Sequence, residues 1–194
     1  MLKILAGVLD FDSGKRQLGH NVATGYYAQH LLELLNPKKH DRKSFDCGVE
    51  ALNLYLQRAA NQDSKRSITR VHVMVEGERI IGFFTLSGHS VLRDNLPDDV
   101  KISSYKDLPF LLLGRLAVDV EFQGRGYGDL LIYHAFKKTA SIAEDAGILG
   151  IVVEAKDDKA ASFYNGIGFL PLEATPQRMV LTIQTINSLL EQAG

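Results

Sequence analysis

The chain has 194 residues, of which 45% are hydrophobic, so it can bury a sizeable core and one domain is expected. Its 22 basic and 23 acidic residues give a net charge of −1, which argues against a protein that coats nucleic acid non-specifically but leaves room for a local basic patch. The single cysteine, Cys47, excludes an internal disulfide and is typical of the reducing cytoplasm, and no apolar run approaches the ~20 residues of a membrane span.

Residues 1–40 are expected to form an N-terminal extension, and residues 41–194 the main domain. In the extension, the apolar spacing from Ala23 to Leu35 predicts a helix. The basic run from Lys38 to Lys43 is interpreted as a solvated linker in preference to a nucleic-acid contact. A second helix is predicted from Val49 to Gln62, because apolar residues recur there at helical spacing.

Short apolar runs alternate with helical patterns in the rest of the chain. Val71–Val75 and Arg79–Ser87 flank a Glu-Gly-Glu sequence and predict a β-hairpin. Leu111–Asp119 and Ile148–Ala155 are mostly apolar, as in strands buried on both faces, and the helical pattern between them predicts a parallel pair. The remaining predicted elements are a helix from Lys159 to Asn165, capped by Asp157 or Asp158, and a strand from Met179 to Ile183. The order predicts an α/β fold with a mixed central sheet flanked by helices.

A glycine-rich segment lies between the strand that ends at Asp119 and the following helical pattern. Its residues are Gln123, Gly124, Arg125, Gly126, Tyr127 and Gly128. Glycines allow successive backbone N–H groups to point at one spot, and a helix start adds unpaired donors and a positive dipole end. The segment therefore predicts a seat for a phosphate or pyrophosphate. It lacks the Lys-Ser/Thr ending of an NTPase P-loop and the G-x-G-x-x-G spacing of dinucleotide-binding folds.

The spacing Q-x-x-G-x-G directly after a strand resembles the acetyl-CoA pyrophosphate loop of the GNAT N-acetyltransferases. Three other segments occur in the order typical of that family: Ile81-Gly82-Phe83, Gly114–Asp119, and Ala160-x-x-Phe163-Tyr164-x-x-x-Gly168-Phe169. Phe45–Gly48, Thr85-Leu86-Ser87 and Val153–Asp157 are similar to one subgroup, the GNAT toxins of bacterial toxin–antitoxin modules. The resemblance covers roughly residues 44–183.

The resemblance implies a GNAT fold in which the parallel strand pair splays apart at the acetyl-CoA site. It implies that acetyl-CoA is the co-substrate, that the strand edge at Leu116, Ala117 and Val118 holds its pantetheine arm, and that residues 123–128 hold the pyrophosphate. Further contacts are implied for Asp157 and Phe163. Tyr164 is the predicted general acid, since a phenol with a pKa near ~10 can protonate a leaving thiolate.

The toxin subgroup acetylates the α-amino group of the amino acid on charged tRNA and blocks translation. The resemblance therefore implies charged tRNA as substrate, a ribbon-helix-helix antitoxin as partner and a homodimeric, cytoplasmic enzyme. The predicted tRNA contacts are Lys65, Arg66, Arg70 and Arg93, since phosphate contacts need cations. Two alternatives stay open: a GNAT enzyme for a small amine or a protein N-terminus, and a non-catalytic module that binds CoA or sequesters an antitoxin.

No general base stands out in the sequence. His89 and Glu154 each lie near the end of a predicted strand, and each is more often a satisfied polar residue than a base. The Cys and His residues do not have the spacing of metal ligands, so no metal is expected.

Overall fold

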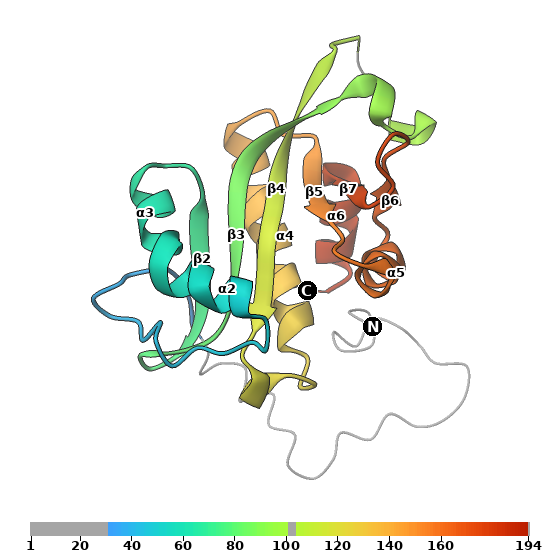
Figure 1. Cartoon of the computed structure of the whole chain (residues 1–194). Coiled ribbons are helices and arrows are strands. Elements are labelled where there is room, and N and C mark those ends of the chain that lie inside the picture. Colours follow the sequence, from blue (N-terminus) through green and yellow to red (C-terminus); the bar gives the residue numbers. More distant parts are fainter. Residues whose placement is uncertain (1–30, 101–103, 194) are drawn as a thin grey trace.

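The computed structural model describes residues 31–100 and 104–193, and a seven-stranded sheet runs through its centre (Figure 1). The strands are β1 (Leu31–Leu34), β2 (Arg70–Glu76), β3 (Arg79–Leu92), β4 (Asp107–Val118), β5 (Gly150–Glu154), β6 (Leu170–Pro171) and β7 (Arg178–Thr182). The helices are α2 (Glu50–Leu54), α3 (Ala60–Lys65), α4 (Tyr127–Asp145), α5 (Asp158–Ile167) and α6 (Ile183–Glu191). A π-helical segment, η2 (Tyr55–Ala59), joins α2 to α3, and the short 3₁₀ turns are η3 (Arg93–Asn95), η4 (Asp98–Val100) and η5 (Val120–Phe122).

The strand order is β1-β2-β3-β4-β5-β7-β6. Neighbouring strands are antiparallel except β4 and β5, which are parallel and joined through α4. This confirms the mixed sheet and the parallel pair predicted from the sequence. Parallel strands end at the same edge of a sheet, so the segments that follow β4 and β5 lie close to each other.

The pairing between β4 and β5 stops long before β4 ends. Leu111, Leu112 and Leu113 pair with β5, whereas β4 continues along β3 as far as Val118. At the point where β5 is lost, the β3–β4 register shifts: Leu86 pairs with Leu113, but Thr85 pairs with Arg115. Gly114 is the extra residue of this β-bulge, and a bulge bends the strand that carries it. The splayed pair implied by the family resemblance is therefore present.

The two faces of the sheet are covered differently (Figure 1). Helices α4 and α6 cover one face and bury Leu131, Ile132, Phe136 and Ile186 among the largest apolar cluster. The opposite face carries two separate clusters. One, under α2, η2 and α3, contains Phe45, Leu56 and Phe83; the other, beside η3 and η4, contains Leu96, Phe110 and Val180. The middle of this second face, along β3 and β4, lies between the two clusters.

The sequence predicted most of these elements correctly. The hairpin forms as expected, but its turn has two residues, Gly77 and Glu78, in place of the three that separate the predicted strands, since Glu76 pairs with Arg79. The helix after β5 begins at the expected aspartate cap. The helix predicted over Ala23–Leu35 is wrong where the structure describes it, because Leu31–Leu34 forms edge strand β1 against β2; the rest of that range lies outside the described residues. The N-terminal extension thus contributes one strand to the sheet. The sequence analysis did not predict α6 or β6.

Gly82 sets the distance between β3, β4 and α4. A Cβ atom at this position would lie 2.8 Å from the Ala117 carbonyl oxygen and 2.8 Å from a methyl group of Leu131, whereas one at Gly88 of the same strand would meet nothing within 4 Å. We expect Gly82→Ala to lower the free energy of unfolding by about 1–3 kcal/mol, because the backbone cannot move away freely. Gly88→Ala should change it by less than about 0.5 kcal/mol. Urea denaturation of both variants measures this, and equal stabilities would contradict the packing argument.

Candidate functional site

The glycine-rich segment forms a turn that leads directly into α4. Two of its glycines, Gly124 and Gly126, have φ angles of 74° and 84°, in the left-handed region that glycine adopts without strain. Gly126 is the N-cap of α4, which begins at Tyr127. The turn follows η5 and therefore lies just beyond the carboxyl end of β4, as the sequence predicted.

The turn presents several unused backbone donors. Among the described residues, the N–H groups of Gly124, Arg125, Gly126 and Gly128 have no hydrogen-bond acceptor. A Cβ atom built at Gly124 or Gly128 would meet nothing within 4 Å, so the space in front of the turn is open. Unpaired N–H groups at the start of a 19-residue helix are a suitable site for a phosphate or pyrophosphate.

The side chains of the glycine turn differ in what they contact. The Gln123 amide donates to the carbonyl oxygens of Val118, at 2.9 Å, and Cys47, at 3.1 Å, so it anchors the turn rather than facing a ligand. The exposed Arg125 guanidinium lies 5.7 Å from the centre of the Phe122 ring and is available to an anion. The buried Tyr127 ring packs edge-on against Phe122, with the ring centres 5.8 Å apart.

The free edge of β4 offers a second set of backbone groups. The Asp119 N–H, just after β4, donates to the carbonyl oxygen of Ile81 in β3, at 2.8 Å. Because successive residues of a strand direct their backbone groups to alternate sides, those of Ala117 also point to β3, whereas those of Leu116 and Val118 point toward the gap left by β5. The Val118 carbonyl oxygen is occupied by Gln123. The edge therefore presents the Leu116 N–H and C=O groups and the Val118 N–H, while Ala117 belongs to the sheet.

Tyr164 and Phe163 lie on α5, beyond the carboxyl end of β5. Tyr164 is half-buried against the large apolar cluster, and its ring centre is 5.3 Å from that of Phe169. Burial raises the pKa of the Tyr164 phenol, which keeps it protonated at neutral pH. Phe163 is 41% exposed, so its ring is accessible to a ligand. The Asp157 carboxylate accepts from the Ala160 N–H at 2.8 Å and caps α5, which commits that oxygen to the helix.

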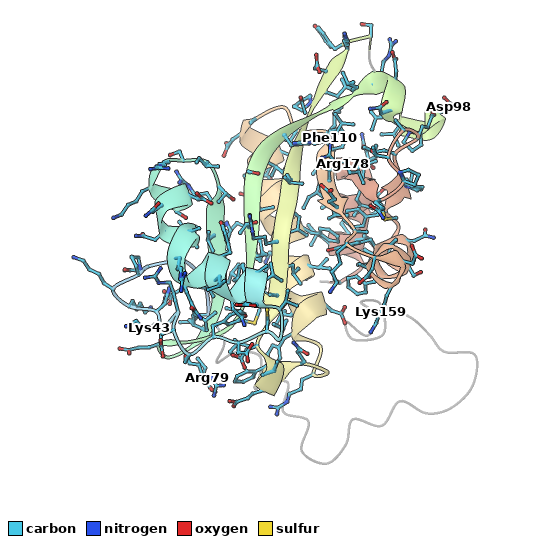
Figure 2. All side chains as sticks on the ribbon, in the orientation of Figure 1. Lys43, Arg79, Asp98, Phe110, Lys159 and Arg178 are labelled. Carbon is cyan, nitrogen blue, oxygen red and sulfur yellow. The ribbon has the colours of Figure 1, made fainter. Side chains whose placement is uncertain are left out.

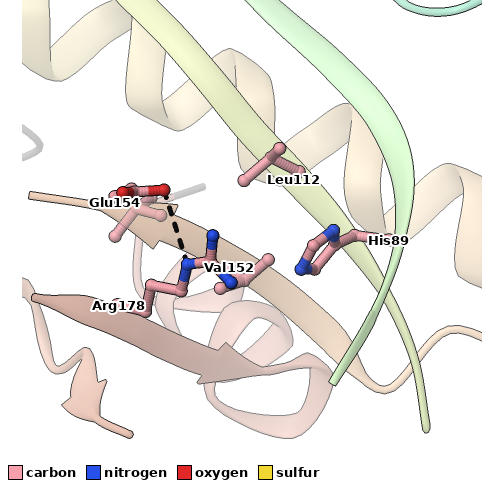
Figure 3. Close-up of a pocket in the computed structure, with 6 residues that line it drawn as sticks. His89, Leu112, Val152, Glu154 and Arg178 are labelled. Carbon is pink, nitrogen blue, oxygen red and sulfur yellow. Dashed lines mark ion pairs between the residues drawn. The ribbon is translucent and has the colours of Figure 1, made fainter. Parts of the chain in front are cut away.

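His89 and Glu154, the two weak candidates for a base, line the same hollow (Figure 3). It lies between the two clusters on the face opposite α4, and Leu112 and Val152 form its apolar floor. Arg178 of β7 also lines it and forms an ion pair with Glu154, with Nε and Oε2 3.4 Å apart. Burial lowers the pKa of His89, Arg178 lowers it further, and Glu154 opposes them, so this imidazole is neutral near pH 7.

The four cations predicted to contact tRNA do not form one group. Lys65 and Arg66 are exposed at the end of α3, and Arg70 follows at the start of β2, where it donates to the Ser64 carbonyl oxygen at 2.8 Å. Arg93 lies seven residues beyond Leu86, the β3 partner of Arg70, which is about 23 Å at 3.3 Å per residue. Its guanidinium is paired with Asp94 at 2.8 Å. The structure therefore groups the first three cations and separates Arg93.

The basic run between β1 and α2 is partly structural. Arg42 donates to the Gln57 carbonyl oxygen of the π-helical segment at 2.9 Å, and Lys39 forms an ion pair with Glu33. Lys43 is exposed on the loop before α2 (Figure 2). These contacts favour a connecting role over a continuous nucleic-acid surface.

Arg115 is a further candidate site residue, which was not predicted from the sequence. It is exposed on β4 directly after Gly114, with its guanidinium 3.7 Å above the centre of the Tyr55 ring. The signal was present in the sequence, since Arg115 is the one charged residue in the apolar run from Leu111 to Val118.

The described parts of the chain show neither a group of metal ligands nor a membrane-spanning helix. Residues 31–100 and 104–193 contain no group of three or more His, Cys, Asp or Glu side chains that could hold a metal ion. None of the helices in these ranges is both long and apolar enough to cross a membrane.

Comparisons with known proteins identify relatives of this site and fold. The family model described as "Acetyltransferase (GNAT) domain" matches residues 67–171. A "Probable toxin TacT" of Sinorhizobium fredii is 32% identical over 174 residues, which are 84% of this chain and 96% of that protein. A "tRNA-acetylating toxin" of Mycobacterium tuberculosis is 31% identical over 150 residues, or 77% of this chain and 90% of that protein.

Solved structures give the same result. AtaT complexed with acetyl-methionyl-tRNAfMet is 33% identical, with a TM-score of 0.77 over 82% of this chain and 98% of that one. AtaTR bound with acetyl-CoA is 34% identical, with a TM-score of 0.72 over 84% and 98%. A mutant AtaT bound to the C-terminus of the antitoxin AtaR is 31% identical, with a TM-score of 0.72 over 83% and 98%.

Proposed function

Because the chain belongs to the GNAT acetyltransferases and is related over most of its length to toxins of that family, we propose that it transfers the acetyl group of acetyl-CoA to the α-amino group of aminoacyl-tRNA. One observation carries the proposal for this chain. The open edge of β4, the unpaired N–H groups at the start of α4, and the Tyr164 phenol all lie beyond the paired part of the two parallel strands. Acyl transfer from a thioester needs groups of these three kinds.

The backbone supplies the binding groups for acetyl-CoA. The N–H groups of Gly124, Arg125, Gly126 and Gly128 receive the pyrophosphate, with the Arg125 guanidinium beside them. The free groups of Leu116 and Val118 pair with the pantetheine arm, and a strand N–H stabilises the thioester oxygen as it gains charge. The side chains of Leu116 and Val118 remain packed on the apolar cluster, so this binding leaves the core undisturbed.

Tyr164 completes the reaction as general acid. When the acceptor nitrogen forms its bond to the acyl carbon, the carbon–sulfur bond breaks and the sulfur takes the phenolic proton. Burial raises the pKa of the Tyr164 phenol, so the hydroxyl carries its proton when the reaction begins. Structures of KacT and AtaT in which one tyrosine is replaced by phenylalanine are also similar to this chain, which supports a functional tyrosine in these toxins.

The acceptor side and the partner form part of the same proposal. We assign tRNA phosphate contacts to Lys65, Arg66 and Arg70, which lie together at the end of α3. Arg70 is in register with Leu86 and, through it, with Leu113, where the strand gap begins. The AtaT–AtaR complex supports an antitoxin partner. From the family resemblance we infer that this antitoxin is a ribbon-helix-helix protein and that the toxin is a homodimer. Charged tRNA is cytoplasmic, so the proposed substrate implies a cytoplasmic enzyme.

The first test of the activity is incubation with labelled acetyl-CoA and bulk charged tRNA, with Tyr164→Phe as the variant. We expect label on the aminoacyl group, and turnover at least ~100-fold lower in Tyr164→Phe, because the ring remains and only the proton donor is lost. Tyr133→Phe on α4 is the control and should keep full turnover. Label transferred to polyamines or peptide amines but not to charged tRNA would contradict the proposed acceptor, and a fully active Tyr164→Phe enzyme would contradict the acid.

The pyrophosphate seat is tested at Gly128, in the first turn of α4. Gly128→Asp places a carboxylate beside the proposed pyrophosphate, although an acid at a helix start favours folding. We expect acetyl-CoA affinity to fall at least ~10-fold, or about 1.4 kcal/mol. Gly128→Ala adds a Cβ into open space and should bind almost as the native chain does. Calorimetry distinguishes the two variants, and equal affinity for both would place the pyrophosphate elsewhere.

The tRNA surface is tested by reversing charge at Lys65 and Arg66. The double change to Glu should raise KM for charged tRNA and reduce the slope of log KM against log salt by about 1 or more, because phosphate contacts release counterions. Lys137 and Lys138, exposed on α4 across the sheet, provide a control with the same change of charge. An equal effect of the two double variants would mean that only net charge matters.

A further inference from the structure

We propose that Arg115 binds the phosphate of the acceptor's 3′-terminal nucleotide, an inference that rests on the proposed function and concerns the face of the sheet opposite α4. Arg115 is exposed, and no carboxylate or other hydrogen-bond acceptor within the described ranges pairs with its guanidinium. Within residues 31–100 and 104–193, the guanidinium contacts the Tyr55 ring, whose centre lies 3.7 Å away. Its N–H groups are therefore free for a ligand.

Tyr55 is a rigid support for this guanidinium. Only 7% of its surface is exposed, and its ring stacks against Phe83 with the centres 6.3 Å apart. It is the first residue of π-helical segment η2, and π-helical turns in helices frequently accompany functional sites. Burial raises the pKa of the Tyr55 phenol, while Arg115 opposes that shift, so the ring stays neutral under the cation. Stacking fixes the guanidinium plane and leaves its edge to form paired hydrogen bonds with an oxyanion.

The position of Arg115 determines which part of an acceptor it can reach. It directly follows the bulge at Gly114 and lies two residues beyond Leu113, the last β4 residue that pairs with β5. It is thus beside the strand gap proposed to hold the thioester. Tyr55, on which Arg115 stacks, belongs to the apolar cluster under α2 and η2. The glycine turn leads into α4, which covers the opposite face of the sheet. The acyl donor and the acceptor therefore approach from different faces.

The surrounding charges favour a nucleic-acid phosphate as the anion. Lys65, Arg66 and Arg70 add positive charge at the end of α3, where Arg70 donates to the Ser64 carbonyl oxygen. Arg70 is in register with Leu86 and, through it, with Leu113, where the gap begins. The Glu154 carboxylate is already engaged, because it forms an ion pair with Arg178. In charged tRNA the phosphate nearest the α-amino group belongs to the terminal nucleotide, so a cation beside the thioester meets that phosphate first.

Two small acceptors isolate this contact: 3′-aminoacyl-adenosine with and without a 5′-phosphate. We expect the native enzyme to prefer the phosphorylated acceptor by at least ~10-fold in kcat/KM, as for one charge-assisted contact, and Arg115→Gln to bring this ratio close to one. KM for charged tRNA should rise by a similar factor. A ratio near one in the native enzyme, or an unchanged ratio in Arg115→Gln, overturns the inference.

Variants at Tyr55 test whether stacking on its ring holds the Arg115 guanidinium in place for the phosphate. Tyr55→Phe keeps the aromatic face and should keep the phosphate preference, whereas Tyr55→Leu should reduce it; thermal melts confirm that both fold. Loss of preference in Tyr55→Phe as large as in Tyr55→Leu would overturn the role assigned to stacking. A native enzyme that acetylates neither small acceptor nor charged tRNA refutes the proposed function itself. An Arg115→Gln variant that loses only antitoxin binding overturns the phosphate inference alone.

Discussion

The gap between β4 and β5 depends on one shift in the pairing of β3 with β4, where Gly114 is an extra residue on β4. Before it, β4 pairs with β3 on one side and β5 on the other; after it, β4 keeps only β3. A strand bent by a bulge cannot hold two neighbours at the usual spacing of about 4.8 Å. A Cβ atom at Gly114 would lie 3.3 Å from the Thr85 hydroxyl, so the bulge is also closely packed. The free edge of β4 is thus a consequence of register.

Two side chains hold the end of β4 and the glycine turn in place. The Asp119 carboxylate is buried and accepts from the Asp46 and Glu121 N–H groups, both at 3.1 Å, with Arg79 at 3.5 Å. Arg79 lies at the end of the sheet where η5 precedes α4 (Figure 2). The Gln123 amide ties the turn to Val118 and to Cys47. Because these side chains anchor the turn, its backbone N–H groups are fixed in position yet remain unpaired.

The two faces of the sheet divide the proposed chemistry. The α4 face offers backbone donors and the cluster against which Tyr164 packs, whereas the opposite face offers a hollow with His89 and an arginine fixed on an aromatic ring. Backbone donors suit a co-substrate whose shape does not vary. Exposed cations suit an acceptor that arrives as a large, charged molecule and must leave again. The strand gap is the place where the two sides meet.

The sequence by itself determined the elements whose signals are local. Apolar runs predicted β4 and β5, the glycine spacing predicted the turn before α4, and Asp157 was correctly placed as one of two possible helix caps. Tertiary structure alone decided what depends on contacts between distant residues. Leu31–Leu34 forms a strand because it pairs with the edge of β2. The backbone groups of Ala117 point to β3 because of the strand register. The Arg115 guanidinium stacks on the ring of Tyr55, which is sixty residues away in the sequence. Periodicity records how each segment buries its own apolar face, but pairing and stacking depend on which partners the fold brings within reach.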